Sequence, residues 1–249
     1  MQSEGYDPIE LSRRIEEIVV RGDRRKYYRL GRPGRFYGGS CAADCVGCNL
    51  SCVFCWSNMP RIRPDIVGRF YSPEEVFDSL IKCSRSRGYR VIRVSGNEPT
   101  IGRDHLLRLL DLVERSGDDV IFVLETNGIL IGHDPSYAEE LSRYQKLHIR
   151  VSLKACNEKG FHRLTGAVPE AFRYQLAALK NLIDNGVSVH PSVMVSFCTE
   201  DELRDLVRRL ASIDPSLPAS LEPEIVTLYP HVMERLKKAG IWPRVFRRP

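Results

Sequence analysis

The segment "CAADCVGCNLSCVFCWSN" at residues 41–58 contains five cysteines within fifteen residues. Two overlapping frames share the spacing C-x3-C-x2-C, namely Cys41-Cys45-Cys48 and Cys48-Cys52-Cys55. Structural zinc sites prefer four Cys or His ligands, whereas three thiolates on a four-iron cluster leave one iron open to another ligand. The spacing therefore favours a catalytic iron–sulfur site over a closed zinc site.

The composition of the chain is that of an ordinary globular protein, with 249 residues, 43% hydrophobic and 28% charged. No apolar run approaches the roughly 20 residues that a membrane helix needs. The start "MQSEGYDPIE" has neither a basic end nor an apolar core, so it does not resemble a secretory signal. We therefore expect a cytoplasmic protein without membrane contact, whose clustered cysteines bind metal or do redox work.

Arginine supplies most of a formal charge of +5, and it is densest at residues 21–35 and in the tail "PRVFRRP". A basic face with tyrosines is compatible with nucleic-acid binding, and equally with a solvated surface. Net charge does not decide between these alternatives.

Beyond residue 70, short apolar strands alternate with amphipathic helices. The expected helices are 71–88, 103–117, 135–144, 169–186, 199–213 and 231–240, and the expected strands are 89–96, 119–128, 146–155, 187–197 and 219–229. This alternation predicts βαβ units and a parallel sheet. With "RFYGG" (35–39) as a first strand there are six strands, which suits an incomplete (β/α)6 barrel or an open doubly wound sheet.

Residues 8–30 are expected to form an extra N-terminal helix followed by a basic loop. We accordingly divide the chain into an N-terminal extension, 1–34, and a single core domain, 35–249. In either sheet architecture, chemistry gathers where the strands end at their carboxyl edge. Polar segments follow these strands, among them "SGNEPT" (95–100) and "LETNG" (124–128).

The segment "CNLSCVFCW" (48–56), with aromatic Phe54 before its last cysteine, resembles the cluster loop of the radical S-adenosylmethionine (SAM) superfamily. The resemblance implies a partial (β/α)6 TIM-type barrel and a [4Fe–4S] cluster held by Cys48, Cys52 and Cys55. It also implies that SAM binds the open iron, where the reduced cluster cleaves it to a hydrogen-abstracting 5′-deoxyadenosyl radical. The upstream frame has Gly47 in place of the aromatic residue, so we assign the cluster to the downstream frame.

The segment "SGNEPT" resembles the Gly-Gly-Glu-Pro motif of that superfamily. Gly96 and Glu98 match it, whereas Asn97 replaces the second glycine. The resemblance implies that Glu98 contacts the SAM amino group, and it places Phe54 and Gly96 beside the cofactor. Apart from the resemblance, Glu98 could be a charge near a helix N-terminus.

The segment "VSLKACNEKGF" (151–161) resembles a strand end of the glycyl-radical-enzyme activases and of the tRNA wyosine-forming enzymes. Lys154 matches the lysine of the activase motif Asp-Leu-Lys, which implies a contact with the SAM ribose, and Ser152 replaces its carboxylate. His190 matches an activase histidine near the ribose. Apart from the resemblance, Lys154 could form a surface salt bridge and His190 could be a core histidine.

The other cysteines leave several alternatives open. Cys41 and Cys45 could ligate a second cluster, form a disulfide or be simple thiols, and Cys156 and Cys198 could supply further ligands from the functional rim. Cys83 lies on an expected helix, where a buried thiol is the usual role.

The leading hypothesis is a radical SAM enzyme that resembles the activases, with ferredoxin or flavodoxin as reductant. Its substrate would be a protein, a small molecule or tRNA, and its oligomeric state is open. The alternatives are a radical SAM tRNA-modifying enzyme, a non-catalytic iron–sulfur redox protein and a zinc-dependent nucleic-acid-binding module.

Overall fold

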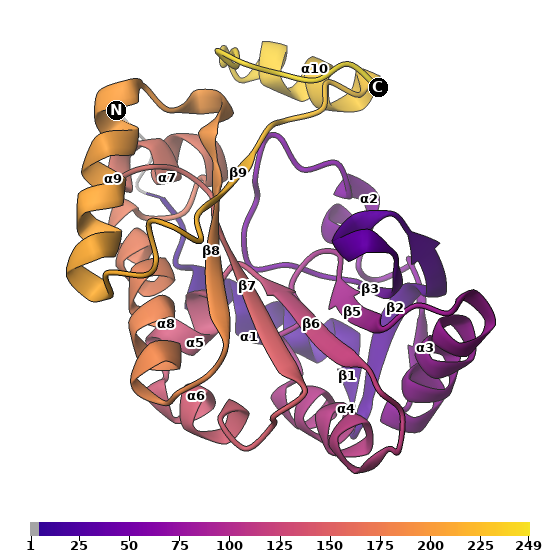
Figure 1. The fold of residues 1–249 in the computed structure, drawn as a ribbon. Coiled ribbons are helices and arrows are strands. Elements are labelled where there is room, and N and C mark those ends of the chain that lie inside the picture. Colours follow the sequence, from indigo (N-terminus) through magenta and orange to yellow (C-terminus); the bar gives the residue numbers. More distant parts are fainter. Residues whose placement is uncertain (1–4) are drawn as a thin grey trace.

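The computed structural model describes residues 5–249, and within them it has one nine-stranded sheet (Figure 1). The strands are β1 (Val20–Arg21), β2 (Arg24–Gly34), β3 (Ser40–Cys45), β4 (Arg69–Tyr71), β5 (Val91–Ser95), β6 (Ile121–Thr126), β7 (Leu147–Leu153), β8 (Val189–Met194) and β9 (Glu222–Glu224). Their order across the sheet is β1-β2-β3-β5-β6-β7-β8-β9, with β4 paired to β2.

Six of the strands are parallel, and each pairs with the one that follows it in the order β3, β5, β6, β7, β8, β9. In a doubly wound sheet the strand order would reverse at a switch point, so the sheet is of the (β/α)6 barrel type. Right-handed crossovers then place the connecting helices on one face. Figure 1 shows α3, α4, α6, α8 and α9 on that outer side.

The helices are those that the apolar periodicity predicts, plus several short ones. The α-helices are α1 (Pro8–Val19), α2 (Asn58–Ile62), α3 (Pro73–Arg87), α4 (Arg103–Arg115), α5 (Ile129–His133), α6 (Pro135–Leu141), α7 (Glu158–Thr165), α8 (Phe172–Asp184), α9 (Glu200–Ile213) and α10 (Pro230–Lys238). Short 3-10 turns are η1 (Phe36–Gly38), η2 (Pro169–Ala171) and η3 (Val195–Phe197).

Local capping explains where α3 begins and ends. The Ser72 hydroxyl accepts a hydrogen bond from the Glu75 amide, and the Glu75 carboxylate accepts one from the Ser72 amide. Gly88 ends the helix in the left-handed conformation, with φ 66°. These are a capping box and a glycine stop, both encoded by residues within or next to the helix.

The prediction of a basic loop after the N-terminal helix was wrong. Residues 24–34 form β2, which pairs with β3 in the antiparallel sense through two register shifts. Arg25 is buried and donates to the carbonyls of Ile101 and Glu98, and Arg32 pairs with Asp44 at 2.8 Å. Part of the basic segment is therefore internal and not a solvated face. The proposed boundary at residue 34 stays a prediction.

The expected first strand at 35–39 was also wrong. Tyr37, Gly38 and Gly39 all have positive φ, at 58°, 74° and 124°, which an extended strand cannot accommodate. The segment makes the turn η1, and the strand begins at Ser40. Cys41 and Cys45 consequently lie in β3, ahead of the cysteine loop and not on it.

One disulfide joins the strand and helix of the first βα unit, and a second joins the exits of two neighbouring strands. Cys41 in β3 pairs with Cys83 in α3, and Cys156 after β7 pairs with Cys198 after η3. Cys83 lies on a helix and in the core, as expected, but it is disulfide-bonded and is not a free thiol. Among the described residues, no helix is long and apolar enough to cross a membrane.

Candidate cluster and cofactor site

The cysteine loop, residues 46–57, leaves the carboxyl end of β3 and is tied down by distant parts of the chain. The Val53 amide donates to the Leu164 carbonyl at 2.9 Å, and the Ser51 amide donates to the Tyr6 hydroxyl at 2.7 Å. Cys48, Cys52 and Cys55 on this loop are free thiols. The loop is irregular in its own backbone, yet its position is fixed by tertiary hydrogen bonds.

The surroundings of the three thiols suit anionic sulfur. The Leu50 amide points at Cys48 Sγ at 3.4 Å, and the Asn127 side-chain amide lies 3.9 Å from the same atom. Burial raises the pKa of the Cys52 thiol to about 12, and the nearby charge of Lys154 acts in the opposite direction. Thiolate ligands must lose their protons, so cluster binding would release protons at these buried sites.

The donor set fits a four-iron cluster better than a single ion. Within residues 5–249, no three His, Cys, Asp or Glu side chains are close enough together to hold one metal ion. A cubic cluster binds each thiolate to a different iron, so its ligands need not converge on one point. Three thiols with amide donors and cations beside them are what such an anionic cluster requires.

Glu98 is fully buried where β5 ends, and its carboxylate accepts four hydrogen bonds from protein groups. Oε1 accepts from the Thr100 amide, the Thr100 hydroxyl and the Thr126 hydroxyl, the last two at 2.6 Å. Oε2 accepts from the Asn127 amide at 2.8 Å. The carboxylate thus joins the ends of β5 and β6. The backbone amide of Glu98 donates to the Gly47 carbonyl of the cysteine loop at 3.0 Å.

Gly96 and Asn97 form the turn that precedes Glu98. Both are left-handed, with φ 71° and 51°. Asparagine tolerates this conformation better than other non-glycine residues, which explains how Asn97 replaces a glycine of the motif. A Cβ atom at Gly96 would lie 3.0 Å from the Cβ of Asp44, so the backbone passes close to β3 there. The Asn97 side-chain amide donates to the Ser57 hydroxyl, which links this turn to the cysteine loop.

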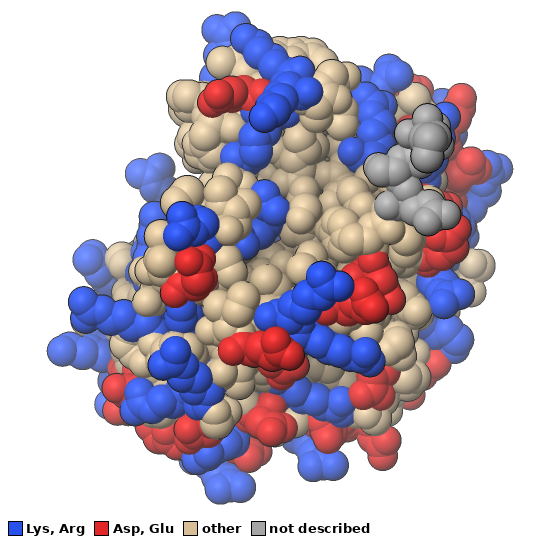
Figure 2. All heavy atoms as spheres, turned by 180° about the vertical axis from the view of Figure 1, so that it is seen from behind, with Lys and Arg blue, Asp and Glu red and all other residues tan. Residues whose placement is uncertain are grey.

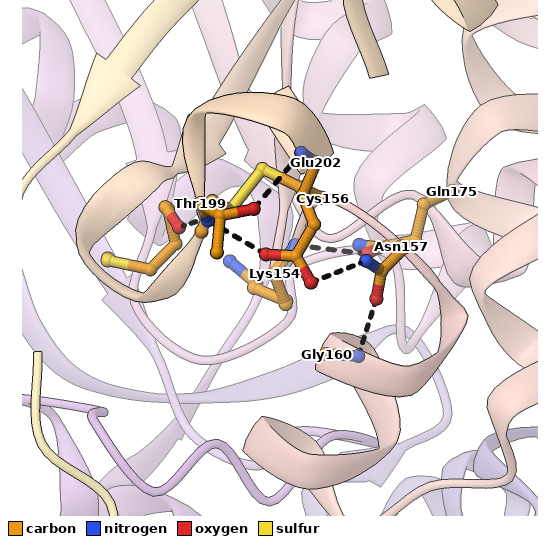
Figure 3. The surroundings of a disulfide bond; sticks show 9 residues. Lys154, Cys156, Asn157, Gly160, Gln175, Thr199 and Glu202 are labelled. Carbon is orange, nitrogen blue, oxygen red and sulfur yellow. Dashed lines mark hydrogen bonds between the residues drawn. A yellow bond between two sulfur atoms is a disulfide. The ribbon is translucent and has the colours of Figure 1, made fainter. Parts of the chain in front are cut away.

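Lys154 and Ser152 lie at the carboxyl end of β7. Lys154 Nζ donates to the Ser152 hydroxyl at 2.7 Å, and that hydroxyl donates to Glu224 of β9 at 3.0 Å. Figure 3 shows Lys154 next to the Cys156–Cys198 disulfide, which joins the exits of β7 and β8. The disulfide and the Gln175 side chain, which accepts from the Lys154 amide, hold this lysine at the rim.

His190 is placed elsewhere. In the sheet it pairs with Arg150 of β7, which lies four residues before Lys154. His190 is therefore nearer the amino end of the strands. Its ring lies between His148, at 2.7 Å, and the Glu222 carboxylate, at 3.2 Å. His190 and Arg150 lower the pKa of Glu222 to about 2, against the effect of its partial burial. The structure therefore does not bring His190 together with the other predicted SAM residues.

Phe54 is buried and packs against Phe197 of η3, with ring centroids 5.6 Å apart. Cys45 is a buried thiol under the loop, and burial raises its pKa to about 12. Cys41, Cys83, Cys156 and Cys198 are all engaged in the two disulfides. In this state they are not available as ligands of a second cluster.

Sequence reasoning missed a side chain from the far end of the chain. Arg235 of α10 donates to the carbonyls of Val53 and Cys55, the former at 3.1 Å. Nothing in the local sequence marks this arginine, since it stands 180 residues away from the loop. Asn127, which follows β6, caps the Ile129 amide with its side-chain oxygen and also approaches Cys48 with its side-chain amide.

Comparison with known proteins agrees with this arrangement. The family model of the "Radical SAM superfamily" matches residues 44–210. A "Probable GTP 3′,8-cyclase" of Thermoplasma volcanium is 30% identical over 121 residues, covering 48% of this chain and 33% of the relative. One of Pyrobaculum aerophilum is 26% identical over 175 residues, covering 70% and 53%. The chain thus spans between a third and about half of the length of these relatives.

Solved structures share the fold at low sequence identity. SuiB of Streptococcus suis, bound to S-adenosylmethionine, has a TM-score of 0.55 at 20% identity over 68% of this chain and 36% of that one. A spore photoproduct lyase mutant with bound AdoMet has a TM-score of 0.55 at 15% identity over 80% and 60%. At this level of identity the likeness supports the fold alone.

Proposed function

Because the chain belongs to the radical SAM superfamily of enzymes, which use a [4Fe–4S] cluster and SAM, we propose that Cys48, Cys52 and Cys55 hold the cluster here. The observation that carries the proposal is their common loop, where they are free while four other cysteines are paired. The family assignment sets aside the non-catalytic redox protein and the zinc-binding module.

When bound, the cluster and SAM supply a one-electron cleavage that yields a hydrogen-abstracting 5′-deoxyadenosyl radical. The protein's part is to position and enclose them. The turn at Gly96 and Asn97 offers close backbone approach next to the cysteine loop, and we assign to it the contacts with SAM's polar end. Glu98 acts as a positioning residue, because its four accepted hydrogen bonds already come from protein.

Lys154 and Ser152 are proposed for the ribose side of SAM, since they stand at the rim of β7 and the Lys154 charge acts on Cys52. Phe54 and Phe197 form an apolar wall that keeps water from the loop. We propose no SAM contact for His190, because its hydrogen bonds lie with His148 and Glu222 at the other end of the strands.

For the substrate, the resemblance to activases supports hydrogen abstraction from a protein glycine or a small molecule. The curated relatives named GTP 3′,8-cyclase favour a nucleotide as the second candidate. The segment "CVFCW" (52–56) resembles that of the tRNA wyosine-forming enzymes, which supports tRNA as the third candidate substrate. An external electron donor such as ferredoxin or flavodoxin would be needed in each case.

The experiment is anaerobic reconstitution with iron and sulfide, followed by SAM and dithionite and a measurement of 5′-deoxyadenosine by mass spectrometry. We expect the nucleoside from the parent and from Cys45→Ala, a matched buried cysteine outside the frame. We expect none from a Cys48→Ala, Cys52→Ala, Cys55→Ala triple variant. A parent that carries a reducible cluster but never cleaves SAM, even with cell extract added, would contradict the proposal.

A further inference from the structure

Two segments that adjoin the cysteine loop concentrate the positive charge of the protein. Residues 56–66 contain two arginines and one aspartate, and residues 229–249 contain six Lys or Arg and one glutamate. Together they carry a formal charge of +6, whereas the whole chain carries +5. All remaining residues therefore sum to about neutral, and the basic character of the protein is local. We call these two segments the basic-apolar surface.

The same two segments also expose most of the large apolar side chains. Of twelve such side chains exposed within residues 5–249, eight lie here: Trp56, Met59, Ile62, Ile66, Tyr229, Trp242, Val245 and Phe246. Trp56 is 50% exposed and Ile66 63% exposed. Scattered single apolar residues are ordinary, but this concentration on an otherwise polar protein marks an interaction surface.

Contacts join the two segments into one surface around the cysteine loop. His231 Nε2 lies 3.0 Å from the Trp56 carbonyl, and Arg235 donates to the carbonyls of Val53 and Cys55. In Figure 1, α10 and the chain end lie above the loop that leads to α2.

The C-terminal segment is held firmly enough to form a defined surface. Arg247 donates its amide to the Val226 carbonyl at 2.8 Å, and Arg244 donates its amide to the Ser196 carbonyl at 2.7 Å. Val232 and Leu236 of α10 are fully buried. Figure 2, from behind, shows Lys and Arg gathered at the α10 end, while the opposite end mixes both signs.

We propose that the basic-apolar surface docks an acidic electron-transfer protein that delivers the electron to the cluster. The inference rests on the proposed function, which needs an electron from outside. The surface is the outer side of the cluster loop, so a protein bound there brings its own redox centre near Cys55. Protein interfaces combine apolar side chains with charged ones, and the positive charge of this surface would steer an acidic partner.

A nucleic acid is the competing occupant of a basic surface with aromatic side chains. Single strands bind by base stacking on aromatic rings within a basic groove. Here half of the eight exposed side chains are aliphatic, namely Met59, Ile62, Ile66 and Val245, which offer no stacking face. The composition therefore favours a protein partner.

The test measures the rate at which the reconstituted cluster is reduced, by stopped-flow bleaching of its visible absorbance. The reductants are a pre-reduced acidic two-cluster ferredoxin and, separately, reduced methyl viologen, which needs no docking surface. The variant is Lys237→Glu, Lys238→Glu, Arg248→Glu, three exposed residues of the surface. The matched control is Arg13→Glu, Lys82→Glu, Arg87→Glu, which makes the same charge change at exposed positions on α1 and α3.

We expect reduction by ferredoxin to fall at least tenfold in the surface variant at low ionic strength, and to fall less than threefold in the control. Reduction by methyl viologen should be as fast in the surface variant and in the control as in the parent. Added salt should slow the reduction of the parent by ferredoxin. Equal ferredoxin rates in parent and surface variant overturn the inference. A surface variant that ferredoxin reduces as fast as the parent, but that no longer binds tRNA, also overturns it and favours a nucleic acid as the occupant. Cluster reduction is read without SAM cleavage, so failure of the proposed function is seen separately.

Discussion

Glu98 shows how a residue of a cofactor motif can serve the fold. Its carboxylate is fully buried and gathers four donors from the ends of β5 and β6. The hydrogen bonds to the Thr100 and Thr126 hydroxyls, both 2.6 Å, are of the short kind that charged acceptors make. The Glu98 backbone amide donates to the cysteine loop. This one residue therefore fixes the relative position of the ends of β3, β5 and β6.

We predict that Glu98→Gln lowers the free energy of unfolding of the cluster-free protein by about 3 kcal/mol. The amide turns one acceptor into a donor that faces other donors, and hydrogen bonds to a charged group contribute about 1.5–3 kcal/mol each. Denaturant unfolding measures the change. Glu17→Gln, on the exposed face of α1, is the control and should change stability by less than about 0.5 kcal/mol. A Glu98→Gln protein as stable as this control would contradict the structural role.

His105 is a second buried polar residue with a structural task. Its Nε2 lies 2.9 Å from the Tyr27 hydroxyl, and its Nδ1 lies 2.7 Å from the Asp23 carbonyl. The carbonyl can only accept, so Nδ1 carries a proton. Burial lowers the pKa of His105 from 6.5 to about 4, helped by the charge of Arg25.

From this pKa we predict that stability decreases as the pH falls. Between pH 6.5 and 4 the unfolded chain binds a proton at His105 that the folded chain does not, so acid favours unfolding. A shift of this size corresponds to a loss of about 3 kcal/mol of stability, which is complete below pH 4 and zero above pH 6.5. Denaturant unfolding at a series of pH values measures the slope. A His105→Gln variant should show a shallower slope, and an unchanged slope would mean that other groups cause it.

At the scale of elements, α10 connects the end of the chain to the cluster loop. Arg235 donates to two carbonyls of that loop, and His231 contacts a third. The arginine side chain is half-buried, so its charge is less screened than it would be at the surface. A fixed cation beside Cys55 would stabilise the added electron of a reduced cluster held on this loop.

We predict that Arg235→Gln makes the cluster harder to reduce, whereas Arg235→Lys does not. The glutamine can still donate to one carbonyl but lacks the charge. A tenfold change in the ratio of reduced to oxidised cluster at fixed potential corresponds to 59 mV for one electron. A redox titration followed by electron paramagnetic resonance measures it. If both variants shift equally, the arginine acts by holding the loop and not by its charge.

At the scale of the whole molecule, two disulfides brace the barrel. Each joins cysteines 42 residues apart; Cys41–Cys83 links β3 to α3 within one βα unit, and Cys156–Cys198 links the exits of β7 and β8. A cross-link that closes a loop of this size stabilises the folded state by about 4 kcal/mol in the chain-entropy description. Cross-links of this kind are uncommon in a reducing cytosol, with hyperthermophile proteins as the known exception.

We predict that Cys41→Ala, Cys83→Ala lowers the free energy of unfolding by about 4 kcal/mol and leaves the iron content of the reconstituted protein unchanged. The stability loss follows from the released loop, and the iron result follows because neither residue lies on the cluster loop. Denaturant unfolding and iron analysis measure the two quantities. Dithiothreitol, which can also open Cys156–Cys198, should destabilise the parent at least as much. Loss of iron in the variant would instead favour a second cluster with these cysteines as ligands.

Much of the fold was predictable because it rests on local patterns. The strand and helix periods, the Ser72 and Thr199 capping boxes and the glycine stop at Gly88 depend on residues a few positions apart. The strand β2 was missed because its pairing with β3 is irregular and its arginines are buried by distant carbonyls. The turn at Tyr37 was missed because its positive φ values follow from packing that alternation does not encode.

The sequence by itself determined the α/β class with a parallel sheet and the loop on which free cysteines would gather, since spacing, alternation and caps act over short stretches of chain; the family and its barrel came from the resemblance of its motifs. Only the tertiary structure decided the partners of the other cysteines, the distant place of His190 and the contact of Arg235 with the loop. Such contacts join residues tens to nearly two hundred positions apart. Their geometry is set by how whole elements pack, which no local pattern specifies.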